Sequence, residues 1–389
     1  MFCFLSSFVF LALVPSVLGQ SYLEGLVQTL NANGLTQLAS IGTSLNGTTI
    51  GQQVLAALPE GNKTLFAPTN AALSALDPAV AGNQNLLSDI IAYHVVSGNF
   101  VNQSETYPNV TIGRTLLNDS ALVMLEGGKA QVLPWSKAAN GSMFALNGGS
   151  NVTISNMTTY NNTEILIIDS VLMPPPNMTT ILGNASYELT SLSSILQSTA
   201  LTGGGSSILN ALTSAHGITV FAPNNAAIAA AQSTLSGLAS NTTALTAVLV
   251  NHIINGTSVY SPEIRANQSL VSAGGEQYSF TNNATGLFVS SGGSSPVQIV
   301  QSDVLVSNGV IHIVNGVLVD TSANPGAASS AYASATSIAA QTVAETGPVG
   351  ASPTSTGSSG GSSGGAVMNG APNPVILGVV AMLAVGQML

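Results

Sequence analysis

The chain has 389 residues, which is enough for two domains with separate cores, and its formal net charge is −10. Its five basic residues are scattered along the chain and cannot form a phosphate-binding face, so nucleic-acid binding is not expected. The single cysteine, Cys3, lies in a predicted signal peptide, so the mature protein would lack disulfides and cysteine-based metal sites.

The N-terminal residues predict a signal peptide at 1–19. Residues 2–14 are apolar, Pro15 interrupts the run, and small or moderate residues precede a cut near Gly19. The usual positive N-terminal region is missing. The alternative is an N-terminal membrane anchor, for which the apolar run is short.

A ten-residue motif occurs twice, at 64–73 and again at 219–228, and seven of its ten positions are identical. Thr-Leu-Phe or Thr-Val-Phe suits a buried strand, and Pro68 or Pro223 would end it because proline has no N–H to donate. Thr69 and Asn224 then stand where a helix N-cap belongs. The spacing of 155 residues predicts two homologous domains, at 21–174 and 187–320, joined by a linker at 175–186.

In the first repeat, helical spacing over 22–58 precedes the motif, and an amphipathic helix then runs from Leu86 to Tyr93 and His94. A strand-rich half follows and ends with a strand at 164–169. Compared with the second repeat, the first carries about 12 extra residues, which we place near 127–149.

The second repeat has the same order. A helix over 243–254 contains Asn251 and His252, and Asn308-Gly309 lies between two β-branched runs, which is a strong hairpin signal. His312 lies in the second strand of that hairpin.

The C-terminal part predicts a tethered protein. Residues 321–363 are almost wholly Ala, Ser, Thr, Gly and Pro, which indicates a disordered stalk. Small residues, a spacer and an apolar end at 364–389 are typical of a GPI-attachment signal, with Ser363 or Gly364 as the attachment residue. The alternative is a short single-pass tail helix.

Asparagine sequons are dense, and with a signal peptide they predict a glycan-covered ectodomain, although an Asn-, Ser- and Thr-rich chain also forms such triplets by chance. The candidate N-glycosylation residues are Asn46, Asn62, Asn102, Asn109, Asn118, Asn140, Asn151, Asn156, Asn161, Asn177, Asn184, Asn241, Asn255, Asn267 and Asn283.

The repeated motif, the helix ends at Tyr93-His94 and Asn251-His252, and the closing segment 307–318 resemble the fasciclin domain family. The first repeat departs from the closing motif, because Leu166 stands where His312 stands in the second. The resemblance implies an α+β fold of two tandem domains, each a twisted sheet wedge with helices packed on one side. It also implies extracellular adhesion or matrix binding rather than catalysis. The layout is similar to GPI-anchored fasciclin proteins of fungal cell surfaces.

In that family the segments that carry the histidines are associated with adhesion. The resemblance therefore suggests Tyr93, His94, Asn251, His252 and His312 as binding candidates. The alternative for each histidine is a structural role, since a histidine at a helix end can bond carbonyl groups. The four histidines show no metal-binding spacing, and we expect neither a metal nor another cofactor.

Three functional hypotheses follow. The first is a cell-surface glycoprotein, either GPI-anchored at the plasma membrane or transferred from its anchor to the cell wall, that binds other surface or matrix components or itself. The second is a structural cell-wall glycoprotein without a specific ligand. The third is a protein that binds or modifies lipid or polysaccharide, which predicts a deep apolar or acidic pocket.

Overall fold

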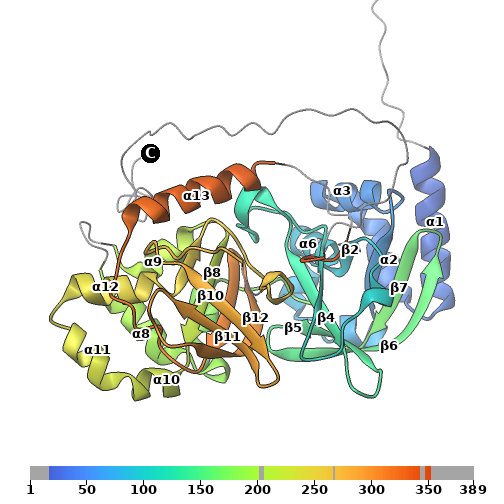
Figure 1. The fold of residues 1–389 in the computed structure, drawn as a ribbon. Coiled ribbons are helices and arrows are strands. Elements are labelled where there is room, and N and C mark those ends of the chain that lie inside the picture. The colour runs from blue at the N-terminus through green and yellow to red at the C-terminus, as the bar shows by residue number, and fades with distance from the viewer. Residues whose placement is uncertain (1–16, 201–205, 266–267, 342–346, 352–389) are drawn as a thin grey trace, which may run out of the picture.

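The structure is a computed structural model that describes residues 17–200, 206–265, 268–341 and 347–351. It has two lobes, each built from one β-sheet with helices packed against it (Figure 1). This confirms the predicted α+β class with two tandem domains. The GPI-attachment signal, with Ser363 and Gly364, lies outside the described residues, as does all but the last three residues of the signal peptide.

The first domain contains a seven-stranded sheet in the order β2-β1-β7-β6-β5-β4-β3. Its strands are β1 (Lys63–Pro68), β2 (Val95–Ser97), β3 (Thr111–Arg114), β4 (Val132–Lys137), β5 (Met143–Asn147), β6 (Ser150–Tyr160) and β7 (Thr163–Ile168). Its helices are α1 (Val17–Ala32), α2 (Thr36–Ser44), η1 (Leu45–Gly47), α3 (Thr49–Ala57), α4 (Asn70–Ser74), α5 (Pro78–Ala81), α6 (Gln84–His94), η2 (Val101–Gln103) and η3 (Glu126–Gly128).

The second domain contains a six-stranded sheet in the order β10-β11-β12-β13-β8-β9. Its strands are β8 (Ile218–Pro223), β9 (Ile253–Asn255), β10 (Tyr278–Asn283), β11 (Gly286–Ser291), β12 (Val297–Val306) and β13 (Gly309–Val314). Its helices are α7 (Met178–Gly183), η4 (Ala185–Tyr187), α8 (Thr190–Ser198), α9 (Ile208–Ser214), α10 (Asn225–Ala230), α11 (Gln232–Leu238), α12 (Thr242–Val250), η5 (Ser261–Glu263) and α13 (Pro325–Ala339).

The repeated motif forms the centre of each sheet. Strands β1 and β8 are fully buried and pair in parallel with β7 and β13, so Phe66 lies opposite Leu166 and Phe221 lies opposite His312. This confirms the equivalence of Leu166 and His312. The predicted caps are also present, since the Thr69 side chain accepts from the Ala72 N–H and the Asn224 side chain from the Ala227 N–H.

The extra residues of the first repeat lie before β4, so their predicted position near 127–149 is correct only at its start, 127–131. Val95 and Val132, which begin β2 and β4, are 37 positions apart, whereas Ile253 and Tyr278, which begin β9 and β10, are 25 apart. The added length includes β3 and the segment from 115 to 131, which carries η3 and contacts the second domain.

The closing hairpin is present, but its turn is shifted by one residue from the prediction. Ser307 and Asn308 form the turn, and Gly309 begins β13. A Cβ at Gly309 would lie 2.0 Å from the Ile218 carbonyl oxygen, so the glycine lets β8 approach. The Asn308 side chain donates to the carbonyls of Leu212 and Ala215 and thereby holds the end of α9 beside the sheet.

The predicted linker and the predicted stalk both contain helices. The predicted linker, 175–186, contains α7, whose Met178, Ile181 and Leu182 pack in the core of the second domain. The predicted stalk, 321–363, begins with α13, which Asn324 caps and Pro325 opens. The composition of this segment is too weakly apolar to form a core of its own. It nevertheless suits a capped surface helix, because alanine has the highest helix propensity.

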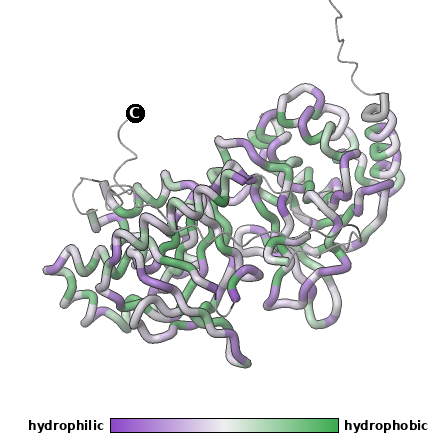
Figure 2. The backbone as a smooth tube through the Cα atoms, turned by 45° about the horizontal axis from the view of Figure 1, so that its top comes forward, coloured by the Kyte–Doolittle hydropathy of each residue, from purple (hydrophilic) through white to green (hydrophobic). Residues whose placement is uncertain are grey.

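The lobes meet along a buried seam. Hydrophobic segments run through the interior of both lobes (Figure 2). One apolar cluster contains side chains from both domains and from the C-terminal segment: Val110, Ile112, Val132, Tyr260, Val310 and Val349. Because these side chains share one buried cluster, the two domains form a continuous packed unit.

Candidate functional site

His94 is the last residue of α6, the equivalent His252 follows α12 by two residues, and both side chains are buried. Each Nδ1 lies 2.7 Å from the carbonyl oxygen four residues earlier, that of Ile90 or Val248. Each Nε2 accepts a backbone N–H, from Leu172 at 3.0 Å or from Leu318 at 2.9 Å. Each histidine therefore ties a helix end to the segment that closes its own domain.

This arrangement requires a neutral ring. Since Nε2 accepts a hydrogen bond, it cannot carry a proton while Nδ1 donates to the carbonyl. Burial lowers the pKa of both His94 and His252 to about 4, against a smaller upward effect of the carbonyl bonded to each ring. Both histidines are consequently uncharged throughout the neutral range.

Tyr93 and Asn251 are also equivalent but make different contacts. The buried Tyr93 hydroxyl donates to the carbonyl of Val132 at 3.2 Å. Asn251 donates to the carbonyls of Asp320 at 3.1 Å and Ser322 at 2.9 Å. The second domain thus uses this position to hold the chain that leads into α13.

His312 lies fully buried on β13, stacked on Phe221 with ring centroids 5.5 Å apart. Its Nε2 donates to the Val259 carbonyl at 2.8 Å, and its Nδ1 accepts the Asp303 N–H at 3.4 Å. Burial lowers the pKa of this imidazole, while the Asp303 carboxylate acts in the opposite direction.

The five residues suggested by the resemblance all have buried side chains. Tyr93, His94, Asn251, His252 and His312 are each at most 4% exposed, and each bonds backbone groups of its own domain. The burial and the backbone bonds therefore favour the structural alternative for the histidines.

Polar contacts cross the seam at the segment that contains the extra residues. The buried Glu126 carboxylate accepts from the Ser258 N–H at 3.2 Å and from its hydroxyl at 2.9 Å, and also pairs with Lys129 at 3.2 Å. Backbone bonds join Met124 N–H to the Ser307 carbonyl and Gly217 N–H to the Met124 carbonyl. This set of bonds fixes the register of one domain on the other.

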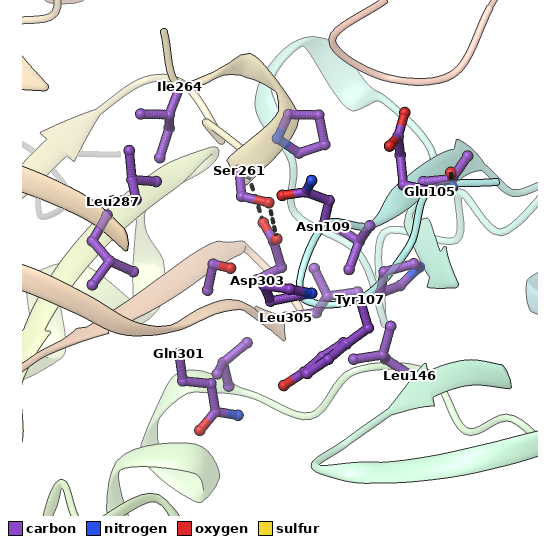
Figure 3. A pocket seen from close by; sticks show the side chains of 18 of the residues that line it. Glu105, Tyr107, Asn109, Leu146, Ser261, Ile264, Leu287, Gln301, Asp303 and Leu305 are labelled. Atoms are coloured by element: carbon purple, nitrogen blue, oxygen red, sulfur yellow. Dashed lines mark hydrogen bonds between the residues drawn. The ribbon is translucent and has the colours of Figure 1, made fainter. Parts of the chain in front are cut away.

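A cleft of about 1160 Å³ opens between the domains beside the seam. Figure 3 shows Tyr107 and Asn109 from the first domain facing Ser261, Gln301 and Asp303 from the second. Of the five candidates suggested by the resemblance, only Tyr93 reaches the lining, and it is 1% exposed. The cleft is therefore made of residues other than those candidates.

Asp303 shapes one wall of the cleft. It lies in an irregular part of β12, with a left-handed φ of +59°. Its carboxylate accepts from the Ser261 N–H at 2.8 Å and from the Ser261 hydroxyl, a pair that Figure 3 marks with dashed lines. Two hydrogen bonds to one residue keep this acidic side chain against the η5 turn.

Most candidate glycosylation residues lie on the surface. Thirteen of them are exposed, Asn255 is half-buried, and Asn267 lies outside the described residues. Asn109, Asn151 and Asn283 line the cleft. Sugar attached at those three positions would enter or border it.

The described residues form neither a metal-binding cluster nor a membrane-spanning helix. No group of three or more His, Cys, Asp or Glu side chains there could hold a metal ion. Within the same part of the chain, no helix combines the length and apolar character needed to cross a bilayer.

Sequence reasoning missed Glu126, Ser258, Asp303 and the cleft. No local motif marks these residues, because their roles depend on contacts between distant segments. Glu126 and Ser258, for example, are about 130 residues apart. The one available signal was the added length of the first repeat, which was placed too far along the chain.

The sequences of both domains are similar to those of known proteins. Residues 24–174 and 188–320 each match the family model of the fasciclin domain. The immunogenic protein MPB70 of Mycobacterium bovis is 30% identical over 167 residues, covering 40% of this chain and 75% of that protein. A fasciclin-like arabinogalactan protein of Arthroderma benhamiae is 25% identical over 298 residues, covering 73% of this chain and 64% of that protein. A solved FAS1 domain pair from the insect cell adhesion molecule Fasciclin I is 14% identical, covers 77% of this chain and 98% of that chain, and has a TM-score of 0.34.

Proposed function

This chain belongs to the fasciclin domain family, and on that premise we propose that it is a cell-surface glycoprotein that binds neighbouring cells, matrix or cell wall. The observation that carries the proposal is the seam between the domains. It combines a shared apolar cluster with the Glu126–Ser258 bonds, so the pair can present one composite surface.

A binding role fits this site better than a catalytic one. The histidines are taken up by backbone contacts, and the Asp303 carboxylate is bonded to Ser261. The cleft contains residues of both domains, so it is a place where a partner would recognise the pair rather than either domain alone.

We also propose an extracellular location with a C-terminal GPI anchor and N-linked glycans. The secretory and anchor signals in the sequence support this, as do the 13 exposed sequon asparagines and the arabinogalactan-protein relative. The partners would be other cell-surface, matrix or wall components, or a second copy of this chain.

Bead capture tests the proposal. Beads coated with the full chain, purified in mild detergent from a host that adds N-glycans, are mixed with each other and with the producing cells. Identical beads carrying the heat-unfolded chain are the control. Each preparation is used with its glycans and after enzymatic deglycosylation.

Clustering or cell capture that survives deglycosylation and is absent from the control is the expected result. Capture by neither preparation would reject adhesion and favour an inert structural glycoprotein. Capture that disappears on deglycosylation would assign recognition to the glycans alone.

A further inference from the structure

The cleft between the domains has almost no charge. Among the described residues of its lining, Glu105 and Asp303 have the only carboxyl groups, and Asp303 is already bonded to Ser261. None of these described lining residues is a lysine, arginine or histidine. A phosphate, a carboxylate or an acidic polysaccharide would therefore enter without a compensating cation, which disfavours anionic ligands.

The polar groups that the cleft offers to a ligand are mainly side-chain amides. Three exposed amide side chains of its lining head no sequon and make no hydrogen bond to another described residue: Gln103, Asn282 and Gln301. Each offers two N–H donors and a carbonyl acceptor. They come from both domains, so a ligand that is rich in donors and acceptors could bond to both walls at once.

The cleft also holds exposed apolar surface. Tyr107 is 58% exposed, and its ring is supported by Phe144, with centroids 6.0 Å apart. Val300 and Met173 in the same lining are 50% and 39% exposed. A supported aromatic ring with a free face provides a flat apolar platform beside the amide groups.

We propose that this cleft binds neutral oligosaccharide. Sugar rings have an apolar C–H face that stacks on an aromatic ring and a rim of hydroxyls that pairs with amide donors and acceptors, and the cleft supplies both. The inference rests on the proposed surface-binding function and specifies the ligand class of its site.

Two sources could supply this chemistry. One is a polysaccharide of the surrounding matrix. The other is an N-glycan of this chain, because Asn109, Asn151 and Asn283 head sequons and line the cleft.

The test uses the full chain in mild detergent and hexamers of glucose, N-acetylglucosamine and mannose as probes. Binding is measured by titration calorimetry for the glycosylated protein and for a variant with Asn109→Gln, Asn151→Gln and Asn283→Gln. Tyr107→Ala and Gln301→Ala remove the platform and one amide. Met157→Ala and Gln197→Ala are matched controls, since both residues are exposed and neither lines the cleft.

At least one hexamer should bind, and Tyr107→Ala should weaken its binding about tenfold, as expected for the loss of an aromatic contact worth about 1.4 kcal/mol. The control variants should bind as the parent does. Binding by the glycosylated protein indicates the matrix source. If a hexamer binds only after the sequons are removed, and an endoglycosidase cannot release the cleft glycans from the folded parent, the occupant is the chain's own glycan.

No binding by either form would overturn the inference, as would binding that Tyr107→Ala and Gln301→Ala leave unchanged. These results are separable from the bead experiment. Capture of cells without hexamer binding would retain adhesion and reject only the sugar-binding cleft.

Discussion

The Glu126 carboxylate of the first domain accepts two hydrogen bonds from Ser258 of the second, one from the backbone N–H and one from the hydroxyl. Both residues are buried, so these bonds form away from water. The Glu126 side chain therefore contributes to the stability of the domain contact, together with the apolar cluster and the backbone bonds of the seam.

Glu126→Ala should weaken the seam by about 2–3 kcal/mol, because the Ser258 N–H and hydroxyl would be left without their acceptor. Urea titration followed by small-angle scattering would detect earlier separation of the lobes as an increased maximum dimension. Glu24→Ala, at an exposed position, is the control and should leave the curve unchanged. Identical curves for both variants would show that the carboxylate does not hold the seam.

Gly217→Ala should cost more than Gly34→Ala. Both glycines have positive φ, +66° and +76°, so each substitution strains the backbone, by about 1 kcal/mol. A Cβ at Gly217 would also lie 2.6 Å from the Glu126 Cβ, whereas nothing lies within 4 Å at Gly34. We expect an additional loss of about 1–3 kcal/mol for Gly217→Ala in equilibrium denaturation. Equal losses would mean that the domains do not approach so closely at this point.

His94→Ala and His252→Ala should each destabilise the chain by about 3 kcal/mol. Each would leave a cavity and a buried N–H, that of Leu172 or Leu318, without an acceptor. His216→Ala, at an exposed position, should change the free energy of unfolding by no more than about 0.5 kcal/mol. Thermal unfolding of the three variants would check this, and a negligible change for His94→Ala or His252→Ala would contradict the assigned bonds.

As the pH falls, buried histidines and a buried glutamate should change the stability of the fold in opposite directions. Burial lowers the pKa of His94 and of His252 to about 4, so as the pH falls from 6.5 the unfolded chain takes up protons on these rings before the folded chain does. Each histidine therefore lowers the free energy of unfolding as the solution becomes more acidic. Burial raises the pKa of Glu263 to about 7, so its protonated form stabilises the fold over the same range.

Glu263→Gln removes the carboxyl group whose protonation stabilises the fold in acid and so opposes the effect of the histidines. It keeps a side-chain acceptor for the Tyr260 N–H. Between pH 6.5 and 4.5, the free energy of unfolding of this variant should fall relative to the parent by up to about 1.4 kcal/mol per pH unit. Urea denaturation at several pH values would measure it. Parallel pH profiles for variant and parent would contradict the assignment.

The sequence predicted those parts of the fold whose causes are local. In the motif at 64–73 and its copy, the strand, the proline that ends it and the capping side chain all lie within about six residues, and the structure has each of them. The resemblance also gave the family and the two-domain organisation, which the family match confirms.

The functional interpretation was less accurate because it depended on distant contacts. His94 was placed at a helix end, yet its decisive partner, the Leu172 N–H, lies 78 residues away. The helix α13 was mistaken for stalk because its composition was judged without its cap at Asn324 or its contacts with the folded domains. The cleft needed the arrangement of both domains, which no periodicity encodes.

The Val349 N–H bonds the Ile112 carbonyl at the edge of the first domain, after α13 has crossed the second. The described residues therefore end at the junction of the two lobes and not at the far end of the second domain (Figure 1). A pull on the chain beyond residue 351 would therefore act first on the junction of the two lobes.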